Sequence, residues 1–220
     1  MFSNRQNFDL LLLELKEKLY EMSDTVERIL QDSVESLKAQ DLELAESVIK
    51  LDSIVDNLEI EINNFAIRLI ATQQPVAKDL RKIISAIKIA NDLERIADLS
   101  VNIAKVTRKI HGQKLIKPLI DIPKMTDHTL KMLRLCIDSY IKEDIELARQ
   151  LDGLDDVIDN GYKRILNELL DYMIKDSRNV DQGQLLGLVA RYIERIADHT
   201  TNIGESVIYL VSGERLDLNK

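Results

Sequence analysis

Acidic residues one helical turn apart recur at matching places in the two halves of this sequence. Carboxylates at positions i and i+4 lie on the same face of a helix. Like charges at this spacing destabilise a helix by about 0.2–0.5 kcal/mol per pair, so a compensating positive group is expected near each pair. Four pairs stand at repeat-related positions: Asp52 with Asp56, Glu94 with Asp98, Asp155 with Asp159, and Glu194 with Asp198.

Two kinds of positive group could provide this compensation. The first is basic side chains, because Arg95 and Arg195 lie inside the acidic motifs and Lys105 lies near one of them. The second is a metal ion or a small metal cluster, because carboxylate oxygens suit hard cations such as Mg, Ca, Mn or Fe. The spacing of the acids does not choose between these alternatives.

Other patterns that could do chemistry are weaker. A ferritin-like di-iron site needs Glu-x-x-His on paired helices, whereas His199 follows Glu194 by five residues and is interpreted as a non-ligand. We find no nucleophile motif around Ser, Thr or Cys136, and no Gly-rich phosphate loop. The basic segment from Gln74 to Lys82 opens a predicted helix and could hold an anion, but we favour an ordinary helix start with a solvated basic turn.

The elements that must position these acids are long helices. Apolar residues recur at 3/4 spacing from Leu12 to Ile29, from Leu44 to Leu69 and from Leu80 to Ile110, which predicts three amphipathic helices. After a break rich in Gly and Pro, further helices are expected at about 123–140, 143–175 and 180–211. Glu94 and Glu194 each take a place in the apolar stripe of their helix.

The two halves are copies of one unit. Residues 41–57 and 144–160 are identical at 8 of 17 positions, and residues 91–105 and 191–205 at 7 of 15. We therefore expect an all-α fold of two tandem three-helix bundles, at 1–113 and 119–220, related by pseudo-twofold symmetry. Because the break is short, the halves should pack together. Small residues line the stripe that holds Glu194, and we favour tight helix packing as their role: Gly183, Gly187, Ala190, Ala197 and Gly204.

Composition excludes several classes of protein. The net charge of −8 argues against a nucleic-acid binder, which normally carries a basic patch. No apolar run approaches the roughly 18 residues that cross a bilayer, and the charged N-terminus is not a signal peptide. The single cysteine, Cys136, suits a reducing cytosol.

The residues resemble those of the PhoU family of phosphate-uptake regulators. Gln74-Pro75-Val76-Ala77-Lys78-Asp79-Leu80-Arg81 looks like the family's Q-P-V-A-x-D-L-R signature. The segment from Asp92 to Asp98 followed by Asn102-Ile103-Ala104 looks like its D-L-E-R-I-x-D…N-I-A pattern, and the segment from Arg191 to Ile203 looks like a second copy. The second repeat lacks the Pro-Val-Ala-x-Asp-Leu-Arg element.

The resemblance implies a non-enzymatic cytoplasmic regulator, with a homodimer as the plausible assembly. Its partners would be the ATPase subunit of the phosphate ABC transporter and a sensor histidine kinase, and it would repress the phosphate-starvation response. Iron or zinc multinuclear clusters in some members map here to Asp52, Asp56, Glu94, Asp98, Asp155, Asp159, Glu194 and Asp198; Mg, Mn, Ca or no metal are the alternatives. A carboxylate-bridged metal store or metalloenzyme, a purely structural bundle, and a regulator of another anion transporter stay open as alternative functions.

Overall fold

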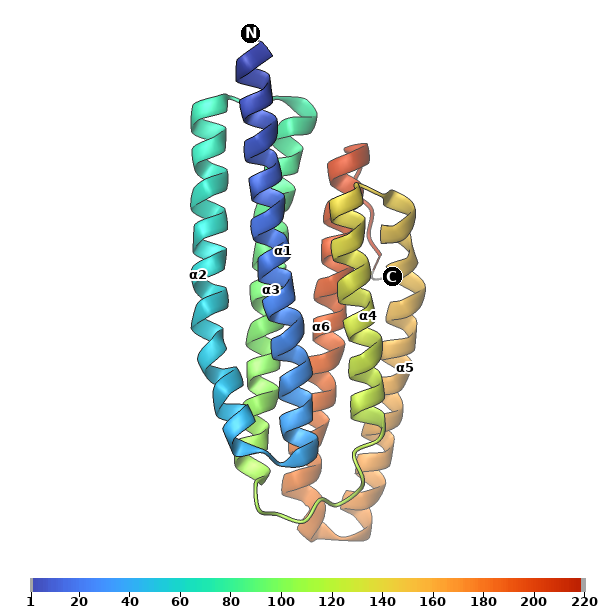
Figure 1. The fold of residues 1–220 in the computed structure, drawn as a ribbon. Helices are drawn as coiled ribbons and strands as arrows, with labels where there is room; N and C mark the ends of the chain where they lie inside the picture. The colour runs from blue at the N-terminus through green and yellow to red at the C-terminus, as the bar shows by residue number, and fades with distance from the viewer. Residues whose placement is uncertain (1, 219–220) are drawn as a thin grey trace.

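The computed structural model describes residues 2–218, with side chains from Arg5 onward, and this part of the chain is built from α-helices (Figure 1). Its six long helices are joined by short loops, and one 3-10 turn at Ser177–Asn179 precedes the last helix. No strand occurs among residues 2–218. The helices are α1 (Phe2–Ala39), α2 (Leu42–Gln73), α3 (Ala77–Ile110), α4 (Asp121–Lys142), α5 (Ile145–Lys175) and α6 (Val180–Ser212).

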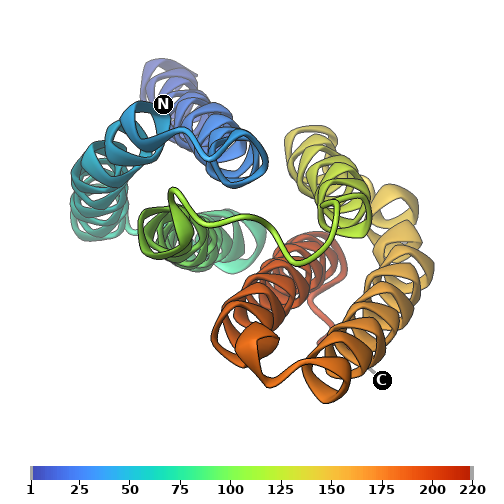
Figure 2. The ribbon, with the colours of Figure 1, turned by 90° about the horizontal axis from the view of Figure 1, so that it is seen from below.

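The helices form two three-helix bundles that lie side by side. α1, α2 and α3 pack on one another, as do α4, α5 and α6, and the bundles meet where α3 packs on α6 and α1 on α4. Figure 2 shows α3 and α6 at the centre, with α2 and α5 outermost. Corresponding helices of the two bundles run in opposite directions (Figure 1), as expected for a pseudo-twofold axis perpendicular to the helices. The predictions of two packed bundles and an all-α fold are confirmed.

Helix ends repeat between the bundles as well. Asp41 and Asp144 cap α2 and α5: the side chain of Asp41 accepts from the backbone N–H of Leu44, and that of Asp144 accepts from the N–H groups of Glu146 and Leu147. The residues before them, Gln40 and Glu143, are left-handed with φ of 53° and 52°. This conformation ends a helix sharply and is uncommon outside glycine.

The expected bounds of the last three helices differ from the observed ones by a few residues, whereas α1 extends ten residues beyond the predicted run at each end. α4 runs from Asp121 to Lys142, where 123–140 was expected, because Pro123 lies inside the first turn. Proline is tolerated there, since the N–H group that it lacks has no partner within the helix. The domain boundaries at 1–113 and 119–220 remain a prediction.

Small residues on α6 let neighbouring side chains approach its backbone. A Cβ on Gly204 would overlap the δ1 methyl of Leu151, and a Cβ on Gly183 would lie 2.8 Å from Cγ of Met173. Both neighbours lie on α5, so these glycines serve tight packing of α5 on α6, as expected from the sequence.

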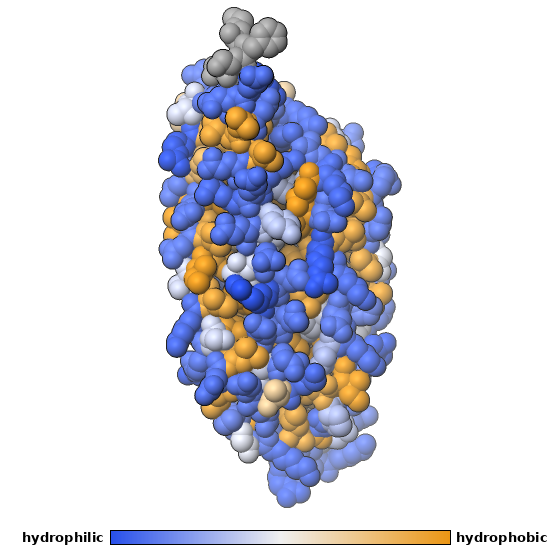
Figure 3. Space-filling model, viewed as in Figure 1, coloured by the Kyte–Doolittle hydropathy of each residue, from blue (hydrophilic) through white to orange (hydrophobic). Residues whose placement is uncertain are grey.

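On the face seen in Figure 3, hydrophobic side chains form separate patches among hydrophilic ones. None of the helices in residues 2–218 combines the length and the hydropathy that spanning a bilayer would take.

Candidate functional site: two acidic clusters and a basic turn

The second acidic cluster joins α5 to α6. Asp155 and Asp159 on α5 interact electrostatically with Glu194 and Asp198 on α6, so the fold brings together all four predicted residues. Burial and the charges of Asp198, Asp159 and Glu194 raise the pKa of Asp155 to about 7. The pKa values of Glu194 and Asp198 are also raised, first by burial. A charged group is disfavoured here by low polarity and by its like-charged neighbours.

The first acidic cluster has the same arrangement between α2 and α3. Burial, followed by the charges of Asp56 and Asp98, raises the pKa of Asp52. Burial, followed by the charge of Asp98, raises the pKa of Glu94, and Asp56 adds to the effect from α2. The four predicted residues of this bundle therefore also lie close enough to repel one another. Glu59, which the sequence analysis did not single out, belongs to the same cluster because its charge also acts on Glu94.

Arginines compensate part of this negative charge, and they differ between the bundles. In the first cluster Arg95 lies 3.4 Å from Glu94 and 3.2 Å from Asp98. In the second cluster Nη1 of Arg191 lies 2.5 Å from Oε1 of Glu194, and Nζ of Lys163 lies 3.8 Å from Oδ2 of Asp159. Sequence reasoning missed Arg191, although its i−3 spacing to Glu194 places both on one helical face.

Two buried oxygens fit the cation hypothesis. Oε2 of Glu194 has no hydrogen-bond partner, and the residue is only 9% exposed. Oδ1 of Asn63 is likewise buried without a partner, while the amide nitrogen of Asn63 donates to Glu59 at 2.5 Å. Buried oxygen acceptors without donors are the ligands that hard cations take. In the conformation described for residues 2–218, however, no three acidic, His or Cys side chains converge closely enough to hold an ion.

His199 pairs with an acid outside the two clusters. Its Nδ1 lies 2.9 Å from Oδ1 of Asp92, so the ring bridges α6 and α3 across the seam between the bundles. Cys136 is fully buried on α4, and burial raises the pKa of its thiol well above the ordinary value. A buried, protonated thiol is unreactive.

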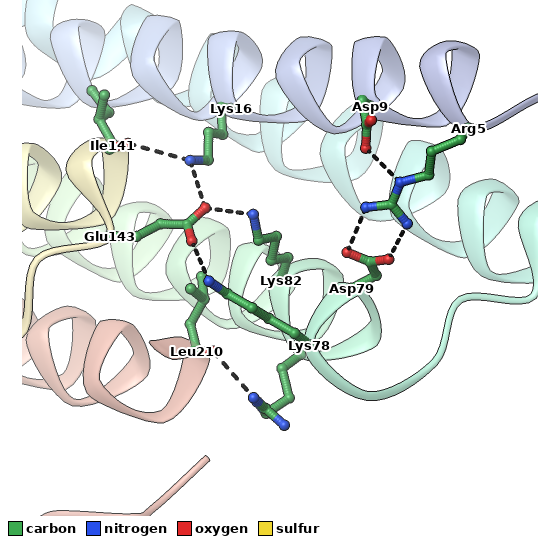
Figure 4. A network of polar contacts seen from close by, with 10 residues as sticks. Arg5, Asp9, Lys16, Lys78, Asp79, Lys82, Ile141, Glu143 and Leu210 are labelled. Atoms are coloured by element: carbon green, nitrogen blue, oxygen red, sulfur yellow. Dashed lines mark hydrogen bonds and ion pairs between the residues drawn. The ribbon is translucent and has the colours of Figure 1, made fainter. Parts of the chain in front are cut away.

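The basic turn that opens α3 makes specific ion pairs. Figure 4 shows the ammonium groups of Lys16, Lys78 and Lys82 around the carboxylate of Glu143, at 3.0, 3.0 and 2.6 Å. Burial alone would raise the pKa of Glu143, but hydrogen bonds from Lys82, Lys16 and Lys78 lower it to about 2. The expectation of a solvated basic turn is wrong for Lys82, whose side chain is only 23% exposed, because Glu143 at the end of α4 supplies a counter-ion; the side chain of Lys78 is 52% exposed.

The rest of the same turn contacts two further elements. Asp79 accepts from Nη1 of Arg5 on α1 at 2.6 Å (Figure 4). Arg81 donates to the backbone oxygen of Leu210 on α6 at 3.4 Å. The segment that opens α3 thus contacts α1, α6 and the residue that follows α4 at one end of the molecule.

Comparison with known proteins agrees with this architecture. The model of the PhoU domain matches twice, at residues 19–107 and 122–207. Among the similar proteins, the PhoU homolog of Clostridium acetobutylicum, described as a phosphate-specific transport system accessory protein, is 41% identical and covers 98% of this chain and 99% of its own. A protein of Aquifex aeolicus with the same description is 39% identical, with 92% of each chain covered.

Solved structures show the same fold. The crystal structure of PhoU from Pseudomonas aeruginosa superposes with a TM-score of 0.90 at 32% identity, covering 94% of this chain and 100% of that one. The phosphate transport system regulatory protein PhoU of Streptococcus pneumoniae gives a TM-score of 0.89 at 28% identity, covering 96% and 99%. With both repeats matched and relatives aligned over nearly the full length, the chain belongs to the PhoU family.

Proposed function

We propose that this protein is a non-enzymatic cytoplasmic regulator of phosphate uptake. It acts with the ATPase subunit of the phosphate ABC transporter and with a sensor histidine kinase, and it represses the phosphate-starvation response when phosphate is plentiful. The observation that carries the proposal is the nearly full-length similarity to proteins described as accessories of phosphate-specific transport. We further propose that the active form is a homodimer.

A deletion strain tests the regulatory role. Loss of the gene is expected to leave a phosphate-starvation reporter active in high-phosphate medium, and the intact gene should restore repression. A reporter that stays repressed after deletion would contradict the proposal. Measuring phosphate and arsenate uptake in the same strains distinguishes a phosphate transporter from another anion transporter as the client.

Co-purification tests the partners. Tagged protein from a gently solubilised membrane fraction should recover the transporter ATPase and the kinase, whereas an unrelated tagged helical bundle should recover neither. Light scattering of the purified protein tests the homodimer: a mass near 50 kDa is expected for two chains of 25.2 kDa each. A mass near that of one chain would contradict the dimer.

We propose as a second property that the acidic clusters bind metal cations, with iron or zinc clusters and Mg, Mn or Ca as the candidates. The candidate ligands are the eight acids of the two clusters. The partnerless Oε2 of Glu194 and the mutual repulsion that raises the pKa of Asp155 support the proposal. A bound cation would supply the positive charge that the arginines provide only in part.

Elemental analysis of protein purified without chelators tests this property. Metal should be present in the wild type and should fall when Glu94→Gln is combined with Asp98→Asn. Glu17→Gln with Glu21→Gln is a matched control, because this acidic i,i+4 pair is exposed on α1 and has no repeat counterpart. Equal metal content in all three proteins, or none in any, would contradict the proposal.

A further inference from the structure

Arg191 contributes positive charge inside the second acidic cluster. Its guanidinium pairs with Oε1 of Glu194 at 2.5 Å, and its positive charge also acts on Asp198. The side chain of Glu194 is 11% exposed and that of Arg191 is 48% exposed. The carboxylate is therefore largely buried, while the guanidinium that pairs with it reaches solvent.

A second contact holds the arginine in place. The guanidinium carbon of Arg191 lies 5.7 Å from the ring centroid of Tyr162 on α5. A cation over the face of an aromatic ring is attracted by the ring's quadrupole. Arg191 is thus fixed between α5 and α6, at the junction that the four acids of the cluster also span.

The first cluster differs at both positions. By the repeat alignment, Asn91 stands where the second repeat has Arg191, and Glu59 stands where it has Tyr162. The first cluster has a neutral amide in place of the cation and a fifth carboxylate in place of the ring. Its own arginine, Arg95, is 56% exposed and pairs with Glu94 at the longer distance of 3.4 Å. The charge of Lys105 also acts on Asp52, but neither Arg95 nor Lys105 pairs with a carboxylate of the first cluster as closely as Arg191 pairs with Glu194.

We infer that the two acidic clusters bind divalent cations unequally, because Arg191 is a built-in competitor that must leave Glu194 before a cation enters the second cluster. The inference rests on the proposed cation binding and adds the order in which cations fill the two clusters. The first cluster fills at low cation concentration and the second only at higher concentration. Arg191 is a specificity-determining residue of the second cluster and not a ligand.

Two double variants, each with only one cluster intact, allow cation binding to each cluster to be measured alone. Glu94→Gln with Asp98→Asn disables the first cluster, and Glu194→Gln with Asp198→Asn disables the second. Manganese binding to each is measured by calorimetry and by the electron paramagnetic resonance signal of free Mn²⁺. The protein with only the first cluster intact should bind Mn²⁺ more tightly than the protein with only the second.

Replacing Arg191 then tests the cause. In the background that retains only the second cluster, Arg191→Asn should tighten Mn²⁺ binding about tenfold, the equivalent of one charged hydrogen bond. Arg195→Asn is the matched control: the charge of Arg195 also acts on Glu194 and Asp198, but Arg195 is exposed and makes no ion pair within 4.0 Å among the described residues, so its replacement should tighten binding less. The reciprocal change, Asn91→Arg, should weaken Mn²⁺ binding to the first cluster.

The outcomes are separable. Equal affinities of the two clusters, or equal effects of Arg191→Asn and Arg195→Asn, would overturn the inference while leaving cation binding intact. If neither cluster binds Mn²⁺ and Arg191→Asn does not create binding, both the inference and the proposed metal site fail. A second cluster that binds Mn²⁺ only after Arg191→Asn supports the inference in its strongest form.

Discussion

Glu143 at the end of α4 lies 2.6 Å from Lys82 on α3, which makes it a direct ionic link between the two bundles. Lys16 and Lys78 reach the same carboxylate, so one acid from the second bundle neutralises part of a three-lysine cluster on the first. The carboxylate is 18% exposed, which limits screening by water and salt.

Removing the charge of Glu143 should destabilise the protein. Glu143→Gln leaves three ammonium groups facing one another without an anion, and we expect a loss of about 1–2 kcal/mol in the free energy of unfolding at pH 7, after allowance for solvent screening. Urea denaturation measures the loss. Glu146→Gln is the matched control: the side chain of Glu146 is 78% exposed and pairs only with Arg149, so its loss should be under about 0.5 kcal/mol. Equal losses would show that Glu143 does not link the bundles.

The same contact predicts a dependence on pH. The pKa of Glu143 is about 2 in the folded protein, against 4.5 as the ordinary value. A lowered pKa means that this stabilisation is present above pH 4.5 and is lost as the pH falls towards 2. The stability difference between wild type and Glu143→Gln should therefore shrink across this range. A difference that stays constant from pH 6 to pH 2.5 would contradict the assignment.

For Asp155 we expect the dependence of stability on pH to have the opposite sign. Its pKa is about 7 in the folded protein, against an ordinary value of 3.8, so the metal-free protein is stabilised below pH 3.8 and loses this stabilisation as the pH rises through 7. In chelator at pH 8, Asp155→Asn should raise the free energy of unfolding by about 1 kcal/mol, after allowance for solvent screening. The gain should vanish near pH 4. Asp152→Asn, an exposed acid on the same helix, is the control and should change little.

Two glycines should respond in opposite directions to the same change. An added Cβ at Gly153 on α5 meets no atom within 4 Å, so Gly153→Ala should stabilise the helix by up to about 1 kcal/mol. At Gly204 the added Cβ would overlap Leu151, which is fully buried and cannot move without repacking. Gly204→Ala should therefore be destabilising by about 1 kcal/mol on balance, despite the better helix propensity of alanine. Thermal unfolding of both variants measures the contrast, and a stabilised Gly204→Ala would show that Leu151 relaxes freely.

The helices, the repeat and the acidic pairs could be predicted because they depend on the order and spacing of residues along the chain. The 3/4 spacing of apolar residues sets which face of a helix is buried, and the same spacing puts Glu94 next to that face. The repeat then placed the four acids of each bundle in equivalent positions. Those predictions required only the geometry of one helix and the alignment of the two halves.

The long-range contacts could not be predicted in this way. Glu143 and Lys16 are 127 positions apart, and nothing in either segment indicates that α1 and α4 meet. The bridge between His199 and Asp92, which joins α6 to α3, could not be predicted for the same reason. Which bundle faces meet depends on how two whole amphipathic surfaces pack, and that is a property of the assembled helices.

For this protein, the order of residues along the chain is enough to predict six helices, their duplication and the two sets of paired acids, because helical periodicity depends on residues three and four positions apart. Only helix packing brings particular basic side chains beside particular acids. Helix packing brings Arg191, and not Arg195, into an ion pair with Glu194. It also brings Glu143 into ion pairs with the basic turn that opens α3. The physical reason is that ion pairs depend on distances of a few ångströms between side chains, and helix packing sets those distances.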